Sequence, residues 1–227
     1  MRSKKIFTYF ITTILMLVVI MLIAVFCISP VKQISSYSKS SSANANSDII
    51  KNIENVEYNK ESGNLNISFA VTEEELNNIL YESMKNRIAI DGLESDINSN
   101  SIKIYINSYL LKVLPTQYMV ELIPSLKDST LILNLKNVKI GRIGIPKKYV
   151  LNKLKENSSN YISVNDDNSI SINNEVVEPF KISSFNIEDS KLRVNLNYSI
   201  KSITDITNLF SNKMPKEVTD YIKNIFR

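Results

Sequence analysis

Few side chains in this sequence of 227 residues could carry out a chemical reaction, because it contains no histidine and a single cysteine, Cys27. Without histidine, Ser-His-Asp and Cys-His nucleophiles and histidine-liganded metal sites are excluded. One cysteine excludes an intramolecular disulfide and cysteine-rich zinc or iron–sulfur sites. The four glycines form neither a GxGxxG nor a GxxxxGK[ST] pattern, so the common phosphate-binding loops are also excluded. The sequence therefore predicts neither a metal nor a cofactor.

Two short segments still offer reactive groups. Asp189, Ser190 and Lys191 could form a Ser-Lys site, and Asp166 with Asp167 could act as paired carboxylates. Both segments are rich in the residues that form turns for backbone reasons. Adjacent side chains on an extended chain also point to opposite sides. We therefore interpret both as turns and expect no enzymatic activity and no catalytic residue.

A run of cations without any carboxylate lies between residues 129 and 155. A helix that begins at Pro146 would add free N–H groups that attract anions. One interpretation is a solvated surface whose charges are balanced by acidic residues from elsewhere. The other is a basic patch around Arg142, Lys147 and Lys148 that meets anionic lipid headgroups or an anionic wall polymer. The whole run consists of Lys136, Lys139, Arg142, Lys147, Lys148, Lys153 and Lys155.

The overall charge argues against a nucleic-acid partner. The net charge is +4, and Arg2, Lys4 and Lys5 supply +3 of it, so residues 6–227 carry only +1. A protein that binds nucleic acid through a general basic field would carry far more positive charge. We therefore expect no nucleic acid among the partners.

Residues 6–28 contain no charged side chain and are long enough, at 1.5 Å per residue, to cross a ~30 Å hydrocarbon core. The three cations that precede them predict a cytoplasmic tail of residues 1–5 and an extracytoplasmic remainder. A cleaved signal peptide would have a shorter apolar run and a small-x-small site. A lipoprotein would need small residues before Cys27, where Val25 and Phe26 stand. An uncleaved single-pass anchor in the cell membrane is the favoured interpretation.

The chain after the anchor divides into a linker and one domain. Residues 29–47 are rich in serine and asparagine and bury too little apolar surface to offset their ordering entropy, so we expect a flexible tether. Residues 48–227 have the length of a single domain.

The best-specified element of that domain is a helix over residues 73–87. Residues 64–71 alternate apolar and polar side chains, which predicts a strand before it. Thr72 is a suitable N-cap with Glu75 at N3, and Val71 can pack on Leu76, so a capping box and a hydrophobic staple are expected. The glutamates at positions 73, 74 and 75 lie at the positive end of the helix dipole, and capping explains them without a catalytic or metal role.

Most of the remaining chain has the period-two pattern of antiparallel strands with one wet face. A change of parity near Asn137 predicts a bulge, and a hairpin is expected around residues 188–191. A short helix should begin at Pro146, and a C-terminal amphipathic helix that begins at Pro215 should pack against the domain. The predicted fold class is α+β, a curled antiparallel sheet packed on a capped helix.

Three blocks of sequence, residues 67–80, 140–151 and 179–192, follow the apolar segment and the polar tether. In this order they resemble the YpmS family of Gram-positive bacteria. The resemblance implies a single-pass envelope protein and brings no established activity or site residues. At the level of fold alone, the expected elements also resemble tubular lipid-binding (TULIP-type) domains.

Two functions remain after this comparison. The first is a binding module for an apolar or lipid-like ligand, held near lipids by the anchor. The second is a structural or interaction protein that docks on an envelope enzyme or assembly, without a ligand, and needs no cavity. From sequence, a ligand groove and a closed core look alike. The groove, if present, would be lined by Phe69, Leu76, Ile79, Leu80, Leu131, Leu133, Val194 and Leu196.

Overall fold

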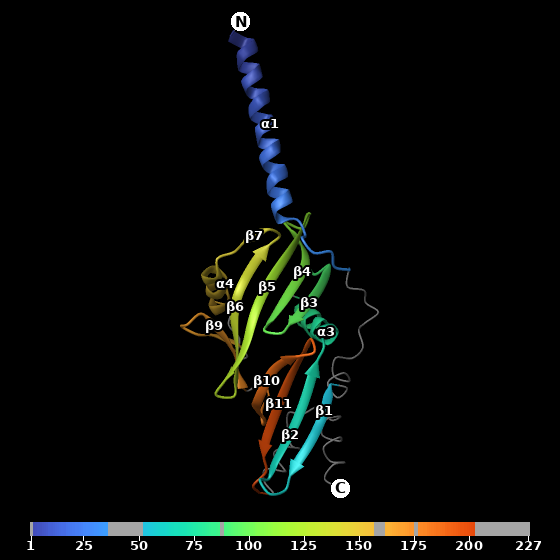
Figure 1. Ribbon diagram of the computed structural model, residues 1–227. Coiled ribbons are helices and arrows are strands. Elements are labelled where there is room, and N and C mark those ends of the chain that lie inside the picture. The colour runs from blue at the N-terminus through green and yellow to red at the C-terminus, as the bar shows by residue number, and fades with distance from the viewer. Residues whose placement is uncertain (1, 36–51, 87–88, 157–161, 175–176, 203–227) are drawn as a thin grey trace.

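The computed structural model describes residues 2–35, 52–86, 89–156, 162–174 and 177–202. A long helix, α1 (Arg2–Ile28), projects from one end of an elongated domain built from two antiparallel sheets (Figure 1). We call the seven-stranded sheet next to α1 the upper sheet and the four-stranded sheet at the far end the lower sheet. The predicted α+β class is confirmed. The predicted C-terminal helix lies outside the described residues.

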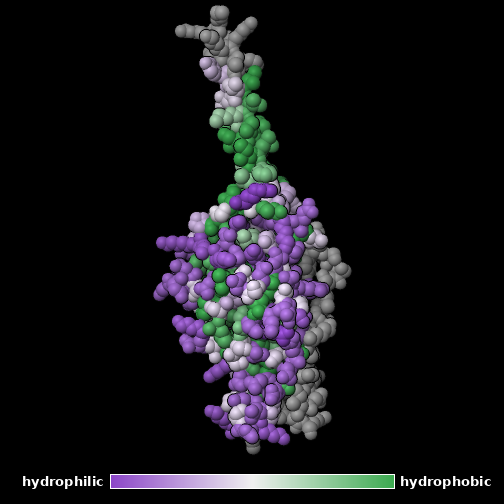
Figure 2. Space-filling view, in the orientation of Figure 1, coloured by the Kyte–Doolittle hydropathy of each residue, from purple (hydrophilic) through white to green (hydrophobic). Residues whose placement is uncertain are grey.

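Helix α1 is apolar enough and long enough to cross a membrane. Its segment from Tyr9 to Ile28 comprises 20 residues, which at 1.5 Å each match a ~30 Å hydrocarbon core. Thr12 and Thr13 donate their hydroxyls to the Tyr9 carbonyl oxygen, each at 2.9 Å, which makes these polar groups tolerable in lipid. Figure 2 shows α1 as a mainly hydrophobic spike on a domain whose visible face is mostly hydrophilic. The helix is therefore compatible with a single-pass membrane anchor.

The lower sheet has the strand order β1-β2-β11-β10. Residues directly opposite each other across antiparallel strands share a face, and here Ile67 faces Leu196 and Phe69 faces Val194. The predicted hairpin is confirmed, with Asp189 and Ser190 both at positive φ in its turn. The strands are β1 (Ile53–Asn59), β2 (Asn64–Val71), β10 (Lys181–Glu188) and β11 (Lys191–Ser199).

The upper sheet has the order β3-β4-β5-β6-β9-β8, and β7 pairs with β6. Glu121 pairs with Asn137 while Leu122 pairs with Leu135, so Lys136 is an extra residue and the predicted bulge is confirmed. The strands are β3 (Gly92–Asn98), β4 (Ser101–Leu110), β5 (Leu114–Lys127), β6 (Thr130–Ile140), β7 (Ile143–Gly144), β8 (Ile162–Val164) and β9 (Ser169–Ile172).

Within the described residues, two helices pack on this framework. At α3 (Glu73–Met84) the predicted capping box is present: Thr72 N–H donates to Glu75 Oε2 at 2.8 Å, and Glu75 N–H donates to Thr72 Oγ1 at 3.3 Å. The helix is one turn shorter than predicted among the described residues, since its last helical residue is Met84. In α4 (Lys147–Glu156), Leu151 is buried against β6 and β9.

The buried apolar residues form three clusters rather than one core. The first lies in the lower sheet around Leu65 and Ile67, and the second joins α4 to the upper sheet around Leu151. The third contains Ile97 and Ile102 of the upper sheet with Leu192 of the lower sheet. This third cluster is therefore the apolar connection between the two sheets.

Candidate functional site

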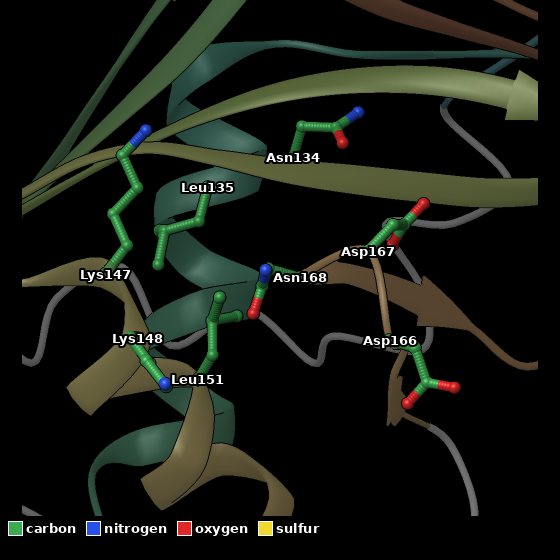
Figure 3. Close-up of a pocket in the computed structure, with 8 residues that line it drawn as sticks. All are labelled: Asn134, Leu135, Lys147, Lys148, Leu151, Asp166, Asp167 and Asn168. Carbon is green, nitrogen blue, oxygen red and sulfur yellow. The ribbon is translucent and has the colours of Figure 1, made fainter.

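A polar pocket brings together two groups of residues that the sequence singled out separately. Its volume is about 680 Å³ (Figure 3). Lys147 and Lys148 enter from α4, while Asp166 and Asp167 come from the turn between β8 and β9 on the other side. The pocket thus carries both charge signs. Its lining consists of Asn134, Leu135, Lys147, Lys148, Leu151, Asp166, Asp167 and Asn168.

The two aspartates of this pocket have separate roles. Ser169 donates to Asp167 Oδ1 from its hydroxyl at 2.6 Å and from its backbone N–H at 3.0 Å. These bonds stabilise the carboxylate and lower the pKa of Asp167 below its ordinary value. Asp166 is exposed, and one of its oxygens lies 3.9 Å from Lys155 Nζ. The predicted turn is confirmed, and Asp167 stabilises it together with Asn165, whose side chain donates to the hydroxyls of Ser169 and Ser171.

The other candidate for chemistry, residues 189–191, also lies in a turn. Asp189 and Ser190 occupy the two positions that require positive φ between β10 and β11. The Asp189 carboxylate lies 3.8 Å from the Arg193 guanidinium, which also approaches Glu188 at 3.4 Å. Lys191 is the first residue of β11. These positions support the interpretation that the segment forms a tight hairpin.

The eight residues proposed to line a groove are spread over both sheets and α3. Phe69 and Leu196 pack with the first cluster, Leu133 with the second and Leu76 with the third. Val194 lies opposite Phe69, and Leu131 lies opposite Ile172. On α3, Leu80 is half-buried and Ile79 is exposed. The strand residues among them therefore belong to the apolar faces of two different sheets.

Sequence reasoning missed the contact between the end of α1 and the upper sheet, which we call the junction. Arg142 Nη1 donates to the Phe26 carbonyl and Arg142 N–H to the Cys27 carbonyl, both at 2.7 Å. Thr116 Oγ1 donates to the Ile28 carbonyl, also at 2.7 Å. The last four carbonyls of a helix have no partner within it, and a cation there complements the helix dipole. The domain thus caps the C-terminal end of α1 directly.

The guanidinium of Arg142 has a second contact in the junction. It lies 4.1 Å from the centroid of the Phe26 ring, within the range of a cation–π interaction. Beside it, Gly141 has a φ of +56°, and a Cβ there would lie 2.5 Å from the Cys27 carbonyl oxygen. Only glycine allows the helix end to approach the sheet this closely.

The chain that follows α1 is held by the side chain of Gln117, which is 2% exposed. Gln117 Oε1 accepts from the N–H groups of Val31 and Lys32 at 3.2 and 3.0 Å. Its Nε2 donates to the Lys32 carbonyl at 2.8 Å and to Asn107 Oδ1 at 2.9 Å. The buried amide of Gln117 therefore fixes the backbone of Val31 and Lys32, where the sequence predicted a flexible tether. Residues 36–47 lie outside the described residues.

Lys32 completes the junction. Its Nζ lies 2.8 Å from Glu94, 2.5 Å from Asp96 and 4.7 Å from the centroid of the Tyr105 ring. Burial by itself lowers the pKa of Lys32, but the hydrogen bonds and charges of Asp96 and Glu94 outweigh it and raise the pKa above its ordinary value. No local signal could have revealed these contacts, because the partners are more than 60 residues away.

The predicted basic patch is divided between these two places. Arg142 belongs to the junction, whereas Lys147 and Lys148 line the pocket. Binding of anionic lipid or wall polymer by these three cations stays a prediction.

Comparison with known proteins identifies no relative of this chain. No family model matches the sequence, and no curated protein or solved structure matches it either. The function must therefore be argued from the geometry of the chain itself.

Proposed function

We propose that this protein is a membrane-tethered extracytoplasmic binding module for an apolar or lipid-like ligand of the cell envelope. The observation that supports this best is a band of apolar side chains along one face of both sheets, which begins beside α1. We call it the apolar tract. The resemblances to the YpmS family and to TULIP-type domains belong to the same proposal.

The tract begins at the strand ends next to the junction. Ile106 lies opposite Tyr118, which lies opposite Ile140, so the three share a face of the upper sheet. Gln117, which precedes Tyr118, contacts the segment after α1, and Gly141, which follows Ile140, contacts the end of α1. The first apolar side chains of the tract are thus one residue away from the junction.

The tract then continues along both sheets. On the upper sheet the next rows pair Ile104 with Val120 and Ile102 with Leu122. Ile102 shares the third cluster with Leu192, which carries the tract to the lower sheet. There it follows the β2–β11 pairs, in which Leu65, Ile67, Phe69 and Val71 face Tyr198, Leu196, Val194 and Leu192.

This arrangement suits a ligand with an acyl chain. Many residues of the tract, such as Phe69, Val120 and Leu196, are only half-buried. An acyl chain that leaves the bilayer along α1 would meet the half-buried apolar side chains of the tract, whereas Leu65, Ile67 and Leu192 are already buried by the protein itself. Each CH₂ kept from water contributes about 0.8 kcal/mol. The anchor would keep the start of the tract at the membrane.

Photocross-linking in native membranes tests the proposal. A benzophenone amino acid at Phe69, far from the bilayer on the tract, should give lipid adducts in mass spectra after irradiation. The matched control places it at Ser68, the neighbouring residue on the opposite face of β2, where no lipid adduct is expected. Position 69 is chosen because lipids around α1 cannot reach it.

Equal lipid labelling at both positions, or none at either, would contradict the proposal. The absence of adducts in chains that retain the thermal unfolding of the wild type would mean that the tract is a closed core. That outcome would favour the alternative, a structural protein that docks on an envelope protein without a ligand.

A further inference from the structure

The turn between β4 and β5 exposes large apolar side chains. Leu111 is 78% exposed and Val113 is 71% exposed, and Tyr109 at the end of β4 is also exposed. Ile143, the first residue of β7, is exposed as well and follows Arg142 of the β6–β7 turn directly. We call Tyr109, Leu111, Val113 and Ile143 the rim. Such a group of apolar side chains marks a surface for a partner or a membrane.

The backbone of this turn makes the exposure of Leu111 more informative. Leu111 and Lys112 have φ values of +54° and +64°, in the left-handed region that favours glycine and asparagine. A two-residue Asn-Gly turn would form more easily and remain polar. The chain instead places a leucine in a strained backbone conformation, where its side chain contacts little of the protein. This suggests that the leucine contacts something outside the domain.

The rim surrounds the end of α1. Thr116, which donates to the Ile28 carbonyl, is three residues after Val113 on β5. Arg142, next to Ile143, donates to the carbonyls of Phe26 and Cys27. Figure 1 shows the β4–β5 turn beside the end of α1 nearest the domain. Both turns of the rim therefore lie beside the last turn of the helix.

The position of that last turn relative to a bilayer follows from the length of the apolar segment. Tyr9 to Ile28 comprises 20 residues, which fill a ~30 Å hydrocarbon core, so Ile28 lies near one boundary of it. Side chains beside Ile28 are then at the level of the lipid headgroups and the first methylenes. Lys112 and Arg142 lie next to rim residues in the sequence, and their positive charges can pair with headgroup phosphates at that level.

We propose that the rim is a second membrane contact, which inserts into the interface of the bilayer that α1 crosses. Leu111, Val113 and Ile143 enter the boundary of the acyl chains, Tyr109 lies at the interface, and Lys112 and Arg142 meet the headgroups. Together with the junction, the rim fixes the tilt of the domain and keeps the start of the apolar tract against the membrane. The proposal depends on α1 being a membrane helix and not on any ligand in the tract.

The absence of tryptophan from the chain allows a direct test. The full chain with Leu111→Trp, one copy per lipid nanodisc, contains a single indole. Its emission should be blue-shifted relative to water and should be strongly quenched when the lipids carry bromine on the upper acyl carbons. The matched control is Ser62→Trp in the exposed turn between β1 and β2, whose emission should be water-like and unaffected by bromine.

Three results would overturn the proposal. Water-like emission from Leu111→Trp, equal to that of the control, would show that the turn stays in solvent. A blue shift without quenching by brominated lipid would show that the turn is buried against protein. If circular dichroism shows that Leu111→Trp does not fold, Val113→Trp on the same turn replaces it. Emission from Val113→Trp that brominated lipid does not quench is the third result that would overturn the proposal.

Discussion

Lys32 shows how a single side chain can convert a polar segment into a fixed one. A lysine on a serine- and asparagine-rich stretch is expected to be solvated, yet here it is enclosed by two carboxylates and the ring of Tyr105. The two carboxylates, Asp96 and Glu94, favour the charged ammonium, and together they outweigh the cost of its partial burial. The contact holds the chain that leaves α1 against β3 and β4.

The raised pKa of Lys32 leads to a prediction about pH. A group whose pKa is higher in the folded state stabilises that state fully below its unfolded pKa of about 10.5 and loses this effect as pH rises through the folded value. Lys32→Gln should therefore lower the thermal unfolding midpoint by the same amount between pH 6 and pH 9. Above about pH 10.5 the difference from the wild type should shrink.

Thermal melts of both proteins across this range provide the measurement. Lys60→Gln, in the exposed turn between β1 and β2, removes a cation far from the junction and the rim and should leave the midpoint close to that of the wild type throughout. If the difference due to Lys32→Gln already disappeared between pH 7 and pH 9, the ion pairs with Glu94 and Asp96 would not be the source of its effect.

Individual side chains were predictable where their partners are close in sequence. The turn roles of Asp167 and Asp189 and the cap at Thr72 involve residues no more than four positions away. Glu73 shows the limit of this reasoning. It was assigned to the helix dipole, but its Oε1 also accepts from the N–H of Ile97 at 2.6 Å and joins α3 to β3. The identity of a partner 24 residues away leaves no trace in local spacing.

At the scale of elements, the decisive arrangement is the close approach of α1 to the turn between β6 and β7. Three carbonyls at the end of the helix are satisfied by the upper sheet rather than by water. These hydrogen bonds couple the end of the helix to the sheet. The sequence suggested a break here because polar composition alone does not distinguish a tether from a segment that pairs with a buried amide.

Gly141→Ala should loosen the junction. The new Cβ would lie 2.5 Å from the Cys27 carbonyl oxygen, and an alanine at positive φ costs roughly 1–2 kcal/mol before any clash. If the junction opens more readily by that amount, trypsin should cleave after Lys32 about 5–30-fold faster, because proteolysis follows the population of the open form. The measurement is the cleavage rate of the full chain in nanodiscs.

Gly144→Ala is the matched control. Gly144 is three residues further along, and a Cβ there would have no heavy atom within 4 Å. Its cleavage rate after Lys32 should therefore remain close to that of the wild type. Equal rates for both variants and the wild type would mean that the junction does not hold the segment after α1.

At the scale of the whole molecule, the apolar residues are distributed along a long axis rather than gathered in one core. Period-two patterns predicted the antiparallel strands but not every buried position. On β5 the polar residues Thr116, Gln117 and Glu121 are buried, whereas Tyr118, Val120 and Leu122 of the predicted apolar face are half-buried. The patterns also did not predict two sheets, because β2 pairs with β11 across more than 120 residues of sequence and periodicity carries no information about partners. The division into an upper and a lower sheet, joined at Leu192, Ile97 and Ile102, emerges only from that pairing.

The predicted orientation of α1 and the domain across a membrane can be tested with introduced cysteines, because Cys27 is the single native one. Arg2, Lys4 and Lys5 before the apolar segment favour a cytoplasmic N-terminus and an extracytoplasmic domain. In a Cys27→Ser background, a cysteine from Ser62→Cys at the far end of the domain should react with a membrane-impermeant maleimide in intact cells without their wall. A cysteine from Ser3→Cys should react only after lysis.

The reverse labelling pattern would place the domain in the cytoplasm and exclude wall polymers as ligands. A mature chain that begins near Cys27 or Pro30 would show instead that α1 is a cleaved signal.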